Sequence, residues 1–300
     1  MEKISSVEEI NKKIISNIVF FGEDAFSNIV LQSLINAGYN IQLVVTPYYE
    51  NIIYKRLEWT CKQNDITFIR CKHINSVELY NQIQEESPDL CVISHFEKLI
   101  KKPLLNLPKY GFINLHPALL PEYRGMSPQH WPIINGEKET GITVHYVDET
   151  ADTGDIICQR RIELTDDMYV SDLQKKWIEE YKTIVIEAIY NISIGAKTIE
   201  QRDLKGSYYG KLKVEQCYID DNFSVSQAYN LVRGVSLPYH GAEYKGIIIY
   251  KAHILIDDKA IKDKYDIGIY LDTEEYPFLR LKDGVLVLDK YIDKNERRDN

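Results

Sequence analysis

The chain has 300 residues, of which 44% are hydrophobic and 27% charged, a composition that excludes disordered, collagen-like and coiled-coil proteins. No apolar run reaches the ~18–20 residues of a membrane span, and residues 1–8 lack the basic start and apolar core of a secretory signal. The net charge is −9, from 22 basic and 29 acidic residues in 1–205 and 14 and 16 in 206–300. We therefore expect a cytoplasmic protein without a membrane or nucleic-acid partner.

The cysteines also agree with a cytoplasmic protein. The five cysteines form no C-x-x-C pair, and an odd number without such spacing argues against a disulfide framework and a zinc site. The sequence predicts no bound metal.

The first part of the chain alternates short apolar runs with helix-like stretches. The expected strands are 17–21, 41–45, 66–70 and 90–94, and the expected helices are 27–37, 53–64 and 76–86. Nearly continuous apolar strands separated by helices are typical of a parallel sheet covered on both faces. The pattern predicts a doubly wound α/β fold, in which ligands bind beyond the carboxyl ends of the strands.

From Gly111 onward, the regular alternation of short apolar runs and helix-like stretches ends. We expect strands at 112–116, 142–147 and 155–164, a long helix at 169–194, and a polar linker at 195–216. After the linker we expect one helix, 225–235, and strands at 242–256, 266–271, 278–281 and 285–292. These elements predict a catalytic domain over 1–205 and a small, mostly β domain over 206–300.

Three features of the sequence are candidates for chemistry. Gly22 follows the first strand and would let a ligand approach the backbone, although there is no G-x-G-x-x-G, and a plain strand-to-helix turn is equally consistent. Asn114 and His116 share one face of a strand and form a donor and proton carrier for a developing oxyanion, whereas a lone Asn-x-His is more often structural. The acidic loop 147–155 suits a divalent metal or, by default, a solvated turn.

The order of these stretches resembles a known family. The matching segments are NLHPALLPEYRG (114–125), Trp131, ING (134–136), GITV (141–144) and DTGDII (152–157). Together they are similar to the signature of the folate-dependent formyltransferases, whose members act on glycinamide ribonucleotide, methionyl-tRNA and nucleotide sugars. The resemblance covers residues 15–205. It implies a formyl transfer from 10-formyltetrahydrofolate without a metal, with Asn114, His116 and Asp152 as the catalytic residues.

The resemblance also implies where the pterin of the donor binds. Two backbone stretches, 94–100 and 147–152, would bound its slot. We expect cofactor contacts from Phe96, Lys98, Ile100, Val147 and Asp148, with ordinary core packing as the alternative for Phe96 and Ile100.

The acceptor has to be inferred from the rest of the chain. The C-terminal part is similar to that of nucleotide-sugar formyltransferases at 207–210, 228–234 and 237–242, and partly to that of the tRNA enzymes. Because the net charge disfavours tRNA, we expect a dTDP- or UDP-linked amino sugar of the kind used in lipopolysaccharide O-antigen biosynthesis. The expected substrate contacts are Gly22, Tyr123, Arg124, Arg233 and Tyr244, the two arginines for a diphosphate.

Several alternatives stay open at this point. Each arginine is more usually a surface or ion-paired residue, and each tyrosine more usually a packing residue. The enzyme could instead be a methionyl-tRNA formyltransferase or a hydrolase that passes the formyl group to water, and a catalytically silent folate-binding protein is the alternative outside enzymes. A homodimer is compatible with the sequence.

Overall fold

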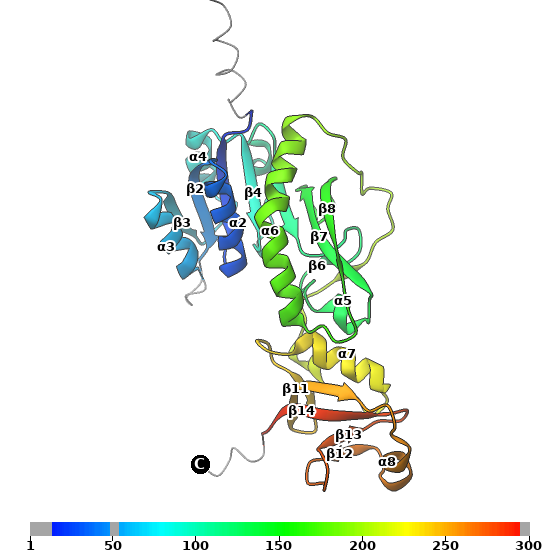
Figure 1. The fold of residues 1–300 in the computed structure, drawn as a ribbon. Helices are drawn as coiled ribbons and strands as arrows, with labels where there is room; N and C mark the ends of the chain where they lie inside the picture. The colour runs from blue at the N-terminus through cyan, green and yellow to red at the C-terminus, as the bar shows by residue number, and fades with distance from the viewer. Residues whose placement is uncertain (1–13, 49–53, 295–300) are drawn as a thin grey trace, which may run out of the picture. The chain divides into compact units, whose positions relative to one another are not determined.

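The computed structural model describes residues 14–48 and 54–294. The chain divides into two compact units (Figure 1). The first unit comprises residues 1–121, 142–160 and 178–206, and the second comprises 122–141, 161–177 and 207–300. The chain crosses from the first unit to the second for the last time between residues 206 and 207, one residue from the domain boundary predicted at 205/206. Two earlier segments assigned to the catalytic domain nevertheless belong to the second unit.

A seven-stranded sheet organises the first part of the chain, in the order β3-β2-β1-β4-β5-β7-β8. Its strands are β1 (Asn17–Gly22), β2 (Asn40–Pro47), β3 (Thr67–Cys71), β4 (Leu90–Ser94), β5 (Phe112–His116), β7 (Glu139–Tyr146) and β8 (Ile156–Glu163). The pairs from β3 through β5 are parallel, and β7 is antiparallel to β5. The predicted α/β fold with a mostly parallel sheet is confirmed.

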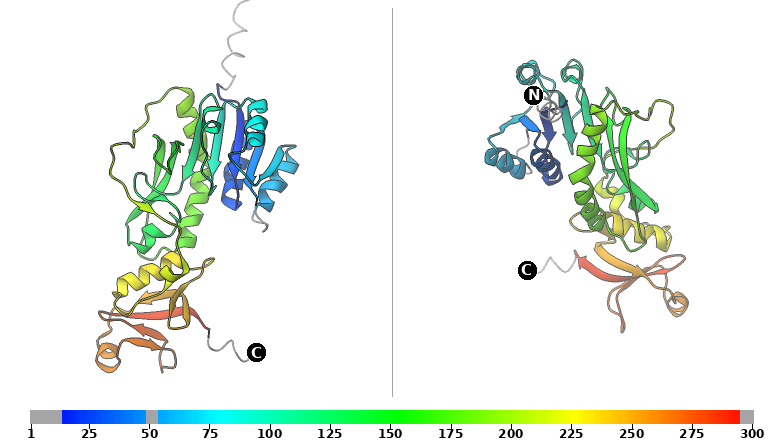
Figure 2. Two further views of the ribbon diagram at one scale, coloured as in Figure 1. Left: turned by 180° about the vertical axis from the view of Figure 1, so that it is seen from behind. Right: turned by 45° about the horizontal axis from the view of Figure 1, so that its top comes forward.

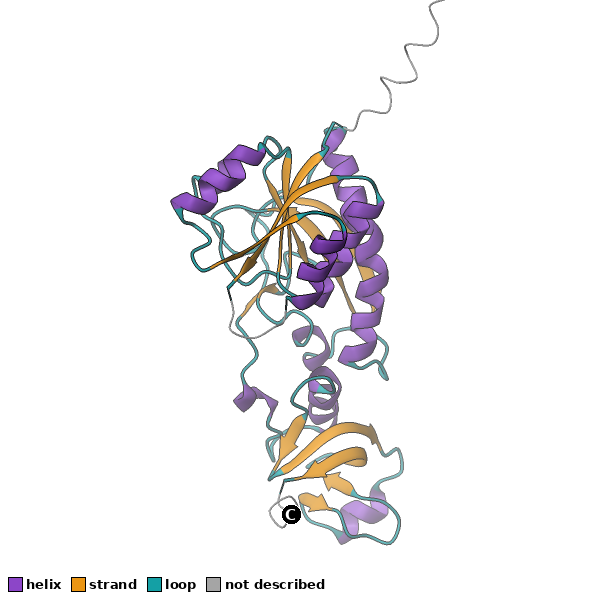
Figure 3. Ribbon diagram, turned by 90° about the vertical axis from the view of Figure 1, so that its left-hand side faces the viewer, coloured by secondary structure: helices purple, strands orange, loops and turns teal. Residues whose placement is uncertain are grey.

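Helices lie on both faces of this sheet, as Figures 2 and 3 show. They are α2 (Ala25–Asn36), α3 (Lys55–Gln63), α4 (Val77–Glu86) and α6 (Val170–Ser193). Asp24 caps α2 by accepting from the Ser27 amide, and Ser76 caps α4 by accepting from the Leu79 amide. The predicted start of α3, residue 53, lies outside the described residues. So do residues 1–8, the segment considered above as a secretory signal. No described helix is long and apolar enough to cross a membrane.

The C-terminal part of the chain forms a five-stranded antiparallel sheet in the order β10-β11-β14-β13-β12. Its elements are α7 (Val225–Val235), β10 (Ala242–Tyr244), β11 (Ile247–Ile254), α8 (Lys259–Lys264), β12 (Gly268–Tyr270), β13 (Phe278–Arg280) and β14 (Val285–Asp293). The mostly β C-terminal part is confirmed. The continuous strand predicted over 242–256 is wrong, because Lys245 and Gly246 at φ 47° and 92° turn it into a hairpin.

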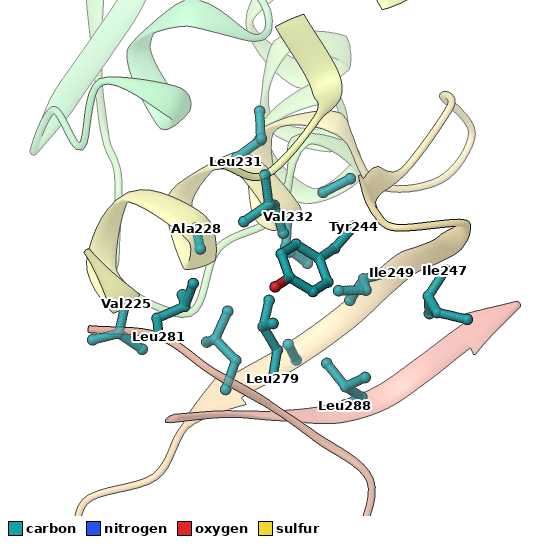
Figure 4. Close-up of a cluster of buried hydrophobic side chains, with 14 of the residues drawn as sticks. Val225, Ala228, Leu231, Val232, Tyr244, Ile247, Ile249, Leu279, Leu281 and Leu288 are labelled. Carbon is teal, nitrogen blue, oxygen red and sulfur yellow. The ribbon is translucent and has the colours of Figure 1, made fainter. Parts of the chain in front are cut away.

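Each unit has its own apolar core. In the first, Val19, Phe21, Leu43, Ile93 and Phe112 belong to one buried cluster beside the strands. In the second, α7 packs its buried face onto the antiparallel sheet, and Figure 4 shows the Tyr244 ring among the side chains of this cluster.

Short elements that the sequence did not predict complete the chain. They are a turn of 3₁₀ helix η2 (Leu104–Asn106), β6 (Arg124–Gly125), α5 (Trp131–Ile134), β9 (Tyr208–Tyr209) and a second turn η3 (Val214–Cys217). β6 and β9 pair in parallel, so the stretch predicted as a linker is in part ordered by pairing.

Candidate active site

Strand β5 carries the two polar side chains singled out by the sequence. Asn114 and His116 lie two residues apart, so both project from one face of the strand. His116 is buried and Asn114 is half-buried. They lie toward the carboxyl end of the last parallel strand of the sheet, and this end of the strands is where doubly wound sheets bind their ligands.

Asp152 reaches this pair from the loop after β7. Its Oδ2 atom lies 3.6 Å from His116 Nδ1, and its Oδ1 atom lies 3.3 Å from Asn114 Nδ2. Asp152 has a φ of 57°, in the left-handed region that residues other than glycine rarely adopt. The structure thus brings the three predicted catalytic residues together, and their catalytic roles stay a prediction.

The loop that carries Asp152 is shaped by its own side chains. Asp148 Oδ1 accepts hydrogen bonds from the Thr150 amide at 2.9 Å and from Thr153 Oγ1 at 2.8 Å. A Cβ atom on Gly154 would lie 1.9 Å from the carbonyl oxygen of Tyr146, so only glycine lets the loop fold back this closely on β7. The acidic loop is therefore held by internal hydrogen bonds.

A second histidine, which the sequence did not single out, belongs to the same cluster. His145 lies opposite Asn114 in the β5–β7 pairing and is 1% exposed. Its Nδ1 lies 2.7 Å from the carbonyl oxygen of Tyr146, so Nδ1 carries a hydrogen in either charge state. Its Nε2 lies 3.2 Å from Asn114 Nδ2 and 3.5 Å from Asp152 Oδ1.

These contacts define the hydrogen-bonding state of Asn114. With neutral His145, both amide hydrogens of Asn114 have an acceptor, one on Asp152 and one on His145. A developing oxyanion would take one of these hydrogens, and because both contacts are long, the exchange costs little. The carboxylate of Asp152 favours a proton on His116 Nδ1, which directs Nε2 of that ring toward proton exchange with a substrate.

A cavity of about 260 Å³ opens where the end of β7 and the loop after it lie next to the start of β5. Val147 and Asp148, two of the predicted cofactor contacts, line it. The other lining residues are Lys102, Leu105, Asn106, Gly111, Phe112, Tyr146 and Glu149. Leu105, Phe112 and Val147 give the cavity apolar walls, and Lys102, Asp148 and Glu149 give it charged groups that could orient a ligand.

The remaining predicted cofactor contacts do not line this cavity. Ile100 is buried in the core of the first unit, and Phe96 packs edge-to-face on Phe21 with ring centres 5.5 Å apart. Lys98 is exposed. Phe96 and Ile100 are thus packed in this core, and their contact with the cofactor stays a prediction.

The predicted substrate contacts have local roles as well. A Cβ atom on Gly22 would lie 2.6 Å from Cβ of Ser27, so close packing already requires this glycine. Tyr123 is buried, stacks on Tyr209 with centres 5.0 Å apart, and donates its hydroxyl hydrogen to Glu137 at 2.6 Å. Arg124 lies in β6 and is half-buried.

The structure buries two of these predicted substrate contacts, which speaks against their assignment. Arg233 is 5% exposed, and its Nη1 donates to the carbonyl oxygens of Thr165 at 3.2 Å and Met168 at 2.9 Å. Such a guanidinium holds backbone together and has little left for a diphosphate. Tyr244 is 1% exposed within the core of the second unit, and its hydroxyl donates to Asp221 at 2.6 Å, so its ring faces offer no stacking surface (Figure 4).

Other polar residues that the sequence gave no reason to choose support the site. Gln201, from the predicted linker, donates to carbonyl oxygens of the loop that carries Asp152. Thr143, on β7, accepts from the Leu120 amide at 3.1 Å. Thr143 and His145 alternate along β7, a pattern that would have indicated a polar face had the pairing with β5 been known. Gln201 had no comparable signal.

The arrangement shows no grouping suited to a metal. Across residues 14–48 and 54–294, no three His, Cys, Asp or Glu side chains are placed to hold an ion together. The absence of a metal from the reaction stays a prediction.

Comparisons with known proteins give this geometry a context. A family profile described as formyl transferase matches residues 18–189. Methionyl-tRNA formyltransferase of Ruminiclostridium cellulolyticum is 34% identical over 232 residues, 75% of this chain and 74% of the relative. The same enzyme of a Geobacillus species is 35% identical over 225 residues, 73% of this chain and 71% of the relative.

Solved structures with the same fold are more distant in sequence. WlaRD, a sugar 3N-formyltransferase crystallised with dTDP and 5-N-formyl-THF, is 18% identical with a TM-score of 0.66, over 92% of this chain and 99% of that one. An N-formyltransferase from Helicobacter canadensis, in complex with folinic acid and dTDP-3-aminofucose, is 17% identical with a TM-score of 0.66, over 91% and 99%.

Proposed function

The chain belongs to the formyl transferase family, and from that premise we propose that it moves a formyl group from 10-formyltetrahydrofolate to the amine of a nucleotide-linked amino sugar. That it is a formyl-transferring enzyme follows from the family. The donor, the acceptor and the residue roles are the proposal. The observation that carries it is the cluster of Asn114, His116 and Asp152 on and next to strand β5.

The chemistry assigns each side chain a step. The acceptor amine attacks the formyl carbon, a new C–N bond forms, and the carbonyl oxygen becomes an oxyanion. Asn114 and protonated His116 donate hydrogen bonds to that oxygen, each worth on the order of 3–4 kcal/mol when well placed. The bond from the formyl carbon to N10 of the folate then breaks. Asp152 takes the proton that the amine loses, directly or through water, and N10 gains a proton as it leaves.

The donor is supported by the cavity and by the comparisons. Leu105, Phe112 and Val147 supply apolar walls, and the backbone around Asp148 supplies polar groups for the edge of a pterin. The two sugar N-formyltransferase structures hold 5-N-formyl-THF and folinic acid.

Two observations support a sugar nucleotide as acceptor. The net charge is −9, whereas an RNA backbone needs many cations to replace its counterions. The fold also spans 99% of each of the two sugar N-formyltransferase chains.

Methionyl-tRNA is the second candidate, and it too has specific support. The relatives at 34% and 35% identity are named methionyl-tRNA formyltransferases. Helix α3 also carries exposed Lys55, Arg56 and Lys62 around Trp59, which is 60% exposed. Cations beside an exposed aromatic ring suit contact with a nucleic acid.

The test compares the two acceptors directly. A panel of dTDP- and UDP-linked amino sugars and charged initiator tRNA is incubated with 10-formyltetrahydrofolate, and mass spectrometry follows the gain of a formyl group. We expect transfer to a sugar, with affinity that weakens little as salt rises. Transfer to methionyl-tRNA alone, with affinity that falls steeply with salt and after Lys55→Glu with Lys62→Glu, would establish the second candidate.

A further inference from the structure

We propose that Gln201 is a positioning residue that holds Asp152 in its catalytic orientation. Gln201 lies outside every segment that matches the family signature, in the stretch the sequence predicted as a linker. The inference rests on the proposed role of Asp152.

Gln201 acts on the backbone of the catalytic loop. Its Nε2 donates to the carbonyl oxygen of Asp152 at 3.2 Å and to that of Gly154 at 2.6 Å. The side chain is 1% exposed, so these bonds are formed away from water, where an unpaired carbonyl is costly. One neutral side-chain nitrogen thereby joins the residues on either side of Thr153.

The backbone around Gln201 is anchored to the same region. Ile199 and Ile156 exchange both backbone hydrogen bonds, at 2.8 and 2.9 Å, in an antiparallel bridge. This bridge places the 199–201 segment along the start of β8, directly after the loop. This bridge therefore holds the backbone next to Gln201 in a fixed position beside the loop.

The loop needs such a restraint because its conformation is unusual. Asp152 has a φ of 57°, and Gly154 packs against the carbonyl of Tyr146 more tightly than any Cβ would allow. A left-handed residue other than glycine persists only where its surroundings enforce it. Gln201 restrains the loop at both of these residues. Losing it lets the Asp152 carboxylate drift from His116 and Asn114.

The substitution that tests this is Gln201→Met, which keeps the length of the side chain and removes both donors. The matched control is Gln42→Met, because Gln42 Nε2 donates to the Glu86 carbonyl at 2.6 Å in the same unit. We expect both variants to fold and to lose a few degrees of Tm. Only Gln201→Met should lower kcat, by about 10- to 100-fold, with KM for the acceptor nearly unchanged.

Two further readouts separate positioning from general stability. In an Asp152→Asn background, Gln201→Met should cost no further activity, because the group it positions is already gone. Hydrogen exchange of the 148–155 backbone should be faster in Gln201→Met and unchanged in Gln42→Met.

Other outcomes would overturn the inference. These are wild-type kcat and exchange in Gln201→Met, equal loss of kcat in both single variants, or an undiminished further loss in the Asp152→Asn background. If the wild type formylates none of the acceptors, that result counts against the proposed function instead. Hydrogen exchange of the 148–155 backbone then still decides the role of Gln201.

Discussion

Polar side chains of the candidate site in the first unit and buried polar side chains of the second unit differ in the distances to their partners. In the first unit, Asp152, His116, His145 and Asn114 face one another, with side-chain distances of 3.2 to 3.6 Å. In the second unit, the guanidinium of Arg233 donates to two backbone carbonyl oxygens and to Asn230 Oδ1, at 2.6 to 3.2 Å.

Other buried groups of the second unit also make short hydrogen bonds. His130 Nδ1 lies 2.7 Å from the carbonyl oxygen of Gly234, and the Tyr244 hydroxyl donates to Asp221 at 2.6 Å. Short bonds to fixed partners hold a fold together, whereas longer contacts among titratable side chains can be exchanged for contacts with a substrate. The comparison therefore separates residues kept for chemistry from residues kept for structure.

The largest effect is expected for Asp152, which contacts the other polar side chains of the candidate site. Asp152→Asn should lower kcat by about 100-fold or more while the Tm changes little, because its role is realised in the transition state. Steady-state kinetics and a thermal melt measure both quantities. The control is Asp289→Asn, which alters an exposed pair with His253 at 3.0 Å. Near-normal turnover of Asp152→Asn would remove this carboxylate from the mechanism.

His145 should have a smaller effect, because it acts through Asn114. His145→Phe removes the Nε2 acceptor and should lower kcat by about 10-fold, with KM for the folate little changed. His145→Gln restores an acceptor oxygen and should recover part of the loss. Equal activity of the wild type and the Phe variant would show that Asn114 does not depend on this ring.

The sequence predicted the strands of the site better than its supporting contacts. β4 and β5 have the predicted bounds, because each is a short run of mostly apolar residues, and α7 has them because its apolar residues recur at helical spacing after the cap Ser224. Asn114, His116 and Asp152 were predicted from a motif, and they do lie together.

Contacts between distant segments could not be read from the pattern. His145 required knowledge that β7 pairs antiparallel with β5, and Gln201 lies in a stretch without any periodicity. The surroundings of Arg233 were equally out of reach, since its type suggested a phosphate ligand while the sequence does not show the backbone carbonyls that it bonds to.

Arg233 tests the structural side of the comparison. Arg233→Met leaves the carbonyls of Thr165 and Met168 without their donor and should lower the free energy of unfolding by about 2–4 kcal/mol. Denaturant unfolding measures that change. KM for a sugar nucleotide should stay within about twofold of the wild-type value, because a residue that does not contact the substrate contributes nothing to its binding. A large rise in KM with unchanged stability would return Arg233 to the diphosphate site.

His130 should affect how stability depends on pH. Burial lowers the pKa of this ring from 6.5, so below that pH the unfolded chain binds a proton that the folded chain does not. Stability is therefore full above about pH 6.5 and is lost as the pH falls. His130→Phe should flatten the curve between about pH 7 and 5, measured by urea unfolding. An unchanged slope would assign the acid sensitivity to other groups.

The smallest effect is expected from removing metal ions. Asp148 accepts hydrogen bonds from Thr150 and Thr153, Glu149 pairs with Lys102, and Asp152 lies against His116 and Asn114, so these three carboxylates of the acidic loop already have partners. A divalent ion would have to displace several of these bonds and bring two carboxylates together, whereas its usual sites offer oxygens without such partners. Prolonged dialysis against a chelator should leave kcat unchanged. A large loss that a single divalent ion restores would reassign the loop from proton transfer to metal binding.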